Sequence, residues 1–77
     1  MEWRERIGVD PGIAFGKPVV KGTRLTVDFI IDLLAHDCPF DEILANYPQL
    51  TREDILACLA FAGEVVEEQI MYPLAAR

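Results

Sequence analysis

Residues 52–69 read REDILACLAFAGEVVEEQ, and this stretch decides the fold. One apolar stripe recurs along it at helical spacing: Ile55, Leu59, Ala62 and Val66. A second stripe lies at an angle to the first: Cys58, Phe61 and Val65. A helix that is apolar nearly all round in its middle is buried from more than one side. The stretch therefore predicts a helix from Arg52 to about Gln69, with more apolar surface than two other helices of so short a chain can cover.

Two shorter helices are predicted upstream of this stretch. Thr26 is a good N-cap, and the apolar spacing from Val27 to Ala35 predicts a helix that ends near His36. Pro39 suits the first position of a second helix, which ends before Pro48. These two helices and the long one form a three-helix body.

The connection into the long helix carries a capping signal. Thr51 is the predicted N-cap residue of the long helix. Asp54, three residues later, is a weaker substitute for the Glu that usually completes a capping box. A tight turn precedes this cap, so the second and third helices are joined like a helix-turn-helix.

Short β-branched runs bracketed by Gly and Pro precede the helices, at residues 6–9 and 16–22. They predict a small β-hairpin or strand pair. A two-stranded ribbon is marginal in water, so these strands must lie on the helices or pair with another chain. The predicted fold is mainly α: a short N-terminal strand pair followed by a three-helix, helix-turn-helix-like bundle. Its single domain, 1–77, comprises strands and turns at 1–25, a three-helix body at 26–70 and a C-terminal tail at 71–77.

The small size of the chain limits how it can be stabilised. Folding hides only about 60% of the surface of so short a chain, so disulfides, a metal or oligomerisation must add stability. Two separated cysteines and one histidine form neither a disulfide framework nor a metal cluster, and no cofactor is predicted. Since 52% of the residues are apolar, sharing a core with a second copy is the simplest remaining support. We expect a homodimer.

The N-terminus mixes acids and bases, and no apolar run approaches the roughly 20 residues that span a bilayer. The sequence therefore predicts a cytoplasmic protein with reduced thiols and no membrane contact.

Charge is distributed unevenly along the chain. The net charge is −6, made of +2 over residues 1–26 and −8 over residues 27–77. DNA would be repelled by the helices and tolerated only by the N-terminal third. Lys17, Lys21 and Arg24 are the candidate contacts to nucleic acid or to an acidic partner. The alternative is structural, with Arg24 paired to a helix acid such as Asp28.

No catalytic residues are predicted. His36 and Cys38 lie two residues apart, but a nucleophile also needs an orienting group and an oxyanion site, which this pair does not supply.

Partner binding is the function that the apolar surplus favours. The candidate partner or dimer interface takes residues from the long helix and from the tail beyond it: Cys58, Phe61, Val65, Ile70, Met71 and Tyr72. Two alternatives stay open. Cys58 can instead be a small core residue, and the tail can fold back onto the helices rather than insert into a partner.

One string of residues resembles a known family. Residues 16–24 read GKPVVKGTR, and with DPGI at 10–13, DEIL at 41–44 and YP at 47–48 they resemble the family called domain of unknown function 433. The resemblance spans about residues 7–63. It implies a homeodomain-like helical fold preceded by short strands, and it raises the expected importance of residues within the string: Gly16, Lys17, Gly22, Thr23 and Arg24.

The same resemblance implies a function. Genes of the family often lie beside a PIN-like nuclease, so the expected role is the antitoxin of a type II toxin–antitoxin module, similar to VapB antitoxins, that binds and neutralises a PIN-like ribonuclease. The alternative is a dimeric transcriptional regulator that contacts DNA through its basic N-terminal strands. A third reading is an accessory subunit of another complex.

Overall fold

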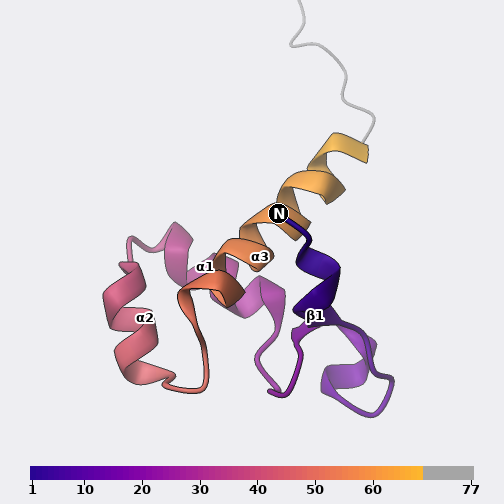
Figure 1. Ribbon diagram of the computed structural model, residues 1–77, viewed down its shortest axis with the longest axis horizontal. Helices are drawn as coiled ribbons and strands as arrows, with labels where there is room; N and C mark the ends of the chain where they lie inside the picture. The colour runs from indigo at the N-terminus through magenta and orange to yellow at the C-terminus, as the bar shows by residue number, and fades with distance from the viewer. Residues whose placement is uncertain (69–77) are drawn as a thin grey trace, which may run out of the picture.

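The computed structural model describes residues 1–68, in which a small strand pair is followed by three helices (Figure 1). The strands are β1 (Ile7–Gly8) and β2 (Val19–Val20). The helices are α1 (Val27–Ala35), α2 (Phe40–Asn46) and α3 (Arg52–Glu68). Two 3-10 helices, η1 (Trp3–Glu5) and η2 (Ala14–Gly16), complete the order. The predicted mainly α fold with an N-terminal strand pair is confirmed.

The strand pair lies on the helices, as its small size requires. β1 and β2 are antiparallel, with Ile7 opposite Val20 and Gly8 opposite Val19. Ile7 and Val20 are buried, at 4% and 1% exposure, and β1 contacts α3. A turn after β2 sends the chain into α1, and Gly22 at its tip has a φ of 81°, a left-handed conformation that glycine adopts without strain.

The start of α3 is held by a complete capping box. The Thr51 Oγ1 accepts from the Asp54 amide at 3.2 Å, and the Asp54 Oδ2 accepts from the Thr51 amide at 2.9 Å. Arg6, which ends η1, donates from Nη1 to the Asp54 Oδ1 at 3.1 Å. Asp54 therefore has two roles: it caps α3, and it connects the start of α3 to the segment before β1. Its position in the sequence indicates only the first of these roles.

The core draws side chains from every main element. Its largest fully buried side chains are Ile30, Ile43, Ile55, Val20 and Cys58. All four buried residues of α3 lie in its N-terminal half: Asp54, Ile55, Ala57 and Cys58. The C-terminal half of α3 therefore projects past the three-helix core.

The helix η1, which the sequence did not predict, covers part of this projecting half, and Figure 1 shows the N-terminal segment beside α3. The Trp3 ring packs edge-on against Phe61, with centroids 4.8 Å apart. The Trp3 Nε1 donates to the Glu64 Oε2 at 2.7 Å.

Within residues 1–68, no helix combines the length and the apolar character needed to cross a membrane.

Candidate functional site

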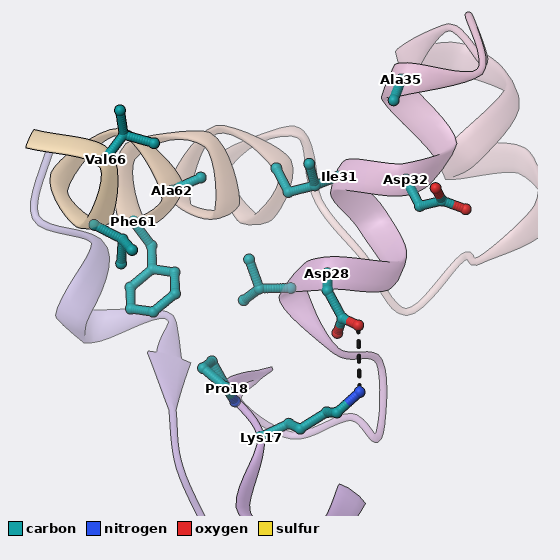
Figure 2. A pocket seen from close by; sticks show the side chains of 11 residues that line it. Lys17, Pro18, Asp28, Ile31, Asp32, Ala35, Phe61, Ala62 and Val66 are labelled. Atoms are coloured by element: carbon teal, nitrogen blue, oxygen red, sulfur yellow. Dashed lines mark hydrogen bonds and ion pairs between the residues drawn. The ribbon is translucent and has the colours of Figure 1, made fainter. Parts of the chain in front are cut away.

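An open apolar groove of about 570 Å³ lies between α1 and the C-terminal half of α3 (Figure 2). Its walls and floor are lined by Pro18, Val27, Ile31, Ala35, Phe61, Ala62, Val65 and Val66, and its polar lining by Lys17, Asp28 and Asp32. The groove exists because α3 continues beyond the core while α1 runs alongside it.

Regular helical spacing builds both walls. On α1, Val27, Ile31 and Ala35 follow one another at steps of four residues and so share one face. Opposite them, Phe61 and Val65 share a face of α3 in the same way. Figure 2 shows Ile31 directed toward α3 and Phe61 directed toward Pro18, which forms the floor.

Carboxylates occupy the α1 side of the groove. The Lys17 Nζ lies 3.4 Å from the Asp28 Oδ2, and this exposed ion pair bridges the segment after η2 to α1 (Figure 2). A hydrogen bond from the Thr26 side chain and, after it, the Lys17 contact lower the pKa of Asp28. Asp32 is also exposed, and its Oδ1 lies 3.6 Å from the His36 Nδ1.

A second apolar feature runs along α3 beside the groove and meets the groove at Val66. Along the outer face of α3, exposed positions alternate at three- and four-residue steps: Leu56, Leu59, Gly63 and Val66. Leu59 is 42% exposed and Val66 is 62% exposed. We call these four residues the outer stripe. Their spacing is that of the a and d positions of a coiled-coil seam.

The structure divides the residues predicted for a partner interface. Phe61 and Val65 both line the groove, although Phe61 is half-buried under Trp3. Cys58 is fully buried in the core of its own chain, so its assignment to a partner surface is wrong, and the core alternative is correct. The tail residues Ile70, Met71 and Tyr72 lie outside the described residues.

Two of the three predicted basic contacts are engaged within the chain. Lys17 pairs with Asp28, and the Lys21 Nζ donates to the Arg4 carbonyl at 2.8 Å. Arg24 is exposed and forms no ion pair with any residue of 1–68. The predicted ion pair between Arg24 and Asp28 is therefore wrong, because Asp28 pairs with Lys17 instead.

The thiols are poorly suited to nucleophilic chemistry. The Cys38 Sγ donates to the Glu42 Oε2 at 3.0 Å, and this hydrogen bond raises the pKa of the Cys38 thiol. Burial, followed by the nearby Asp54 charge, raises the pKa of Cys58 to about 12. The His36 Nδ1 lies 2.8 Å from the Asp32 carbonyl rather than reaching Cys38. Within residues 1–68, no three His, Cys, Asp or Glu side chains are grouped to hold a metal ion.

Sequence reasoning missed the α1 wall of the groove. The apolar spacing predicted the helix α1, but not that Ile31, which is half-buried, lines a groove. The four-residue repeat of Val27, Ile31 and Ala35 was a usable signal, but it does not reveal which residues of a face remain uncovered.

Residues 7–62 match the model of a family described as "Protein of unknown function (DUF433)". The chain belongs to the DUF433 family. Among solved structures it is similar to a DUF433 member protein from Anabaena variabilis, with 32% identity and a TM-score of 0.76. That similarity covers 82% of this chain and 62% of the Anabaena protein, so this chain spans less than two thirds of that relative's length. No curated protein matches the chain.

The DUF433 match includes both strands, α1, α2 and most of α3. It ends at residue 62, within the groove. Val65 and Val66, which form the far part of the α3 wall, therefore lie beyond the matched region.

Proposed function

We propose that this DUF433 chain is a non-catalytic binding protein that acts in the cytoplasm as the antitoxin of a type II toxin–antitoxin module, where it binds and neutralises a PIN-like ribonuclease. The observation that carries the binding role is the groove between α1 and α3. It is open and almost wholly apolar, and no described residue of the chain fills it. Apolar surface of this kind typically marks a protein contact.

Charge supports a nuclease as the partner. A ribonuclease must attract RNA phosphates with basic side chains, and residues 27–77 of this chain carry a net charge of −8. An acidic surface docked beside a basic cleft complements its potential and opposes entry of RNA.

Co-expression with the product of the adjoining gene tests the antitoxin role. We expect a stable complex in which the nuclease activity is suppressed. The control is the nuclease purified alone, which should cleave RNA. An unrelated neighbouring gene product, or full nuclease activity within the complex, would refute the proposal.

A homodimer is proposed on the outer stripe. Leu56 and Leu59 are 37% and 42% exposed on a face that points away from the core, and a matching helix from a second copy would cover them. Gly63, in the middle of the stripe, lets two helices approach closely. Sedimentation at micromolar concentration should show a dimer, and Leu59→Glu should yield a monomer that remains helical. A wild-type monomer at that concentration would contradict this proposal.

The alternative function, a dimeric DNA-binding regulator, has narrower support. Arg24 is exposed beside the strand pair and free of ion pairs within residues 1–68. At the start of α3, however, the Arg52 guanidinium lies over the Phe40 ring at 4.8 Å, and acidic residues follow it. A regulator should bind operator DNA with an affinity that falls steeply as salt rises. Absence of retardation at low salt would eliminate this alternative.

A further inference from the structure

We infer that the groove between α1 and α3 receives an amphipathic helix of a partner protein, with an apolar face flanked by lysine or arginine side chains. This inference rests on the proposed binding function and specifies the partner element that the groove fits. Three properties of the groove support it: its backbone, its length and its charge.

The backbone of the groove walls requires a helical occupant. Both walls are α-helices whose interior amides and carbonyls are paired within the helix, so neither can add an extended strand by main-chain hydrogen bonds. The apolar lining offers few side-chain partners to an entering peptide. A buried backbone must satisfy its own hydrogen bonds, and a helix does so internally.

The length of the groove matches a short helix. Val27 and Ala35 are eight residues apart on α1, which corresponds to about 12 Å along the helix axis. A partner helix laid along this wall would contact it through positions i, i+3 or i+4, and i+7. Its apolar side chains would cover Val65, which is 38% exposed, and Val66.

Acidic groups lie on both sides of the groove. Asp28 and Asp32 line the α1 side, and Glu68 follows Val65 by three residues and so extends the same face of α3. Lys17, the one basic residue that residues 1–68 contribute to the lining, is already paired with Asp28. Lysine or arginine flanks on the occupant would complement these carboxylates, whereas the acidic α1 or α3 of a second copy would repel them.

A displayed library of single-helix peptides, selected against the full chain, tests the occupant directly. The library keeps an alanine-rich helical framework and randomises one face and both flanks. We expect the enriched peptides to carry apolar residues at i, i+3 or i+4 and i+7, with lysine or arginine on the flanks. Enrichment without a basic preference would overturn the inference.

Matched variants locate the binding site. Val65→Glu places a charge in the groove, and Leu59→Glu makes the same change at a position of the same helix outside the groove lining, at similar exposure, 42% against 38%. The enriched peptides should bind the Val65→Glu chain about tenfold or more weakly, while Leu59→Glu leaves their affinity unchanged. Equal affinity for Val65→Glu and the wild type would overturn the inference, provided that circular dichroism shows both chains folded.

A charge reversal tests the role of the acidic side. Asp32→Lys should weaken binding of the basic-flanked peptides and improve binding of the same peptides with glutamate flanks. Asp41→Lys on α2 makes the same change in net charge away from the groove and should do neither. If Asp32→Lys and Asp41→Lys change the peptide affinities equally, Asp32 does not contact the flanks of the peptide and the inference fails.

The outcome for the groove is separable from the outcome for the antitoxin role. If Val65→Glu still binds and inhibits the neighbouring nuclease, the antitoxin proposal stands and the groove inference falls. If basic helical peptides bind the groove but the nuclease does not bind the chain, the groove inference stands and the antitoxin proposal falls.

Discussion

Asp54 illustrates how much one side chain holds together at the residue scale. Its carboxylate accepts from the Thr51 amide at 2.9 Å and from the Arg6 guanidinium at 3.1 Å, and the residue is only 8% exposed. The capping role could be predicted from sequence because it depends on neighbours three residues apart. The bond to Arg6 could not, because it joins residues 48 positions apart.

Asp54→Ala should destabilise the fold by about 2 kcal/mol, since it removes half of the capping box and the carboxylate that pairs with Arg6. Urea denaturation followed by circular dichroism measures the loss. Glu53→Ala is the matched control, because Glu53 is an exposed acid in the same helical turn, and it should change the stability by less than about 0.5 kcal/mol. Equal losses in the two variants would show that Asp54 has no special role.

Glu42→Ala should make Cys38 more reactive toward iodoacetamide near pH 8. The Glu42 carboxylate raises the pKa of the Cys38 thiol, so removing it increases the thiolate fraction, and the thiolate is the reactive form. Mass spectrometry of the alkylated chain gives the rate. Asp41→Ala removes the adjacent acid, which has no bond to the thiol, and should leave the rate unchanged. Cys58 should be labelled only on unfolding.

At the scale of elements, η1 determines how much of α3 is covered. The sequence predicted α1 and α3 well because caps and apolar periodicity are local signals. Nothing local identified residues 3–5 as a cover for the end of α3, because the Trp3 contacts with Phe61 and Glu64 are tertiary.

Trp3→Ala should cost about 2 kcal/mol of unfolding free energy, because it removes the ring contact with Phe61 and the bond to Glu64. Thermal and urea denaturation followed by circular dichroism measure the change. As the control, Arg4→Ala removes exposed ion pairs and the guanidinium that lies 4.4 Å from the Trp3 ring centroid, but keeps the Trp3 contacts with Phe61 and Glu64, and should cost about 1 kcal/mol. A Trp3→Ala chain as stable as Arg4→Ala would mean that η1 does not anchor α3.

Asp28, at the start of α1, should make the free energy of unfolding depend on pH. The pKa of Asp28 is lowered in the folded chain, so its stabilising contribution is present above the ordinary aspartate pKa and disappears as pH falls through the lowered value. Asp28→Asn should therefore reduce the urea midpoint near pH 7 and match the wild type near pH 2. Glu67→Gln serves as a surface control. A constant difference between wild type and Asp28→Asn at both pH values would contradict this linkage.

For the whole molecule, the apolar surplus of α3 was predictable but its distribution was not. Periodicity showed that the helix is apolar nearly all round. The division into core, groove and outer stripe depends on where α1 and η1 pack. Cys58 and Val65 occur in the same predicted stripe, yet one is fully buried and the other is 38% exposed. The groove therefore required the tertiary structure.

The proposed dimer predicts a melting temperature that depends on protein concentration. Association stabilises the folded chain by mass action, so raising the concentration a hundredfold should raise the Tm of the wild type. Leu59→Glu, which disrupts the outer stripe, should have a Tm that does not change with protein concentration. A wild-type Tm that is independent of concentration over the same range would exclude a folding-coupled dimer.

The bond between Trp3 and Glu64 joins residues 61 positions apart, so every residue up to Glu64 must be made before it can form. Residues that are still inside the ribosome cannot make this contact. Trp3 leaves the ribosome well before α3 does, and its ring is exposed to water during that interval. The contact between the N-terminal segment and α3 therefore forms only after residue 64 has left the ribosome, and until then the Trp3 ring stays exposed to water and to chaperones.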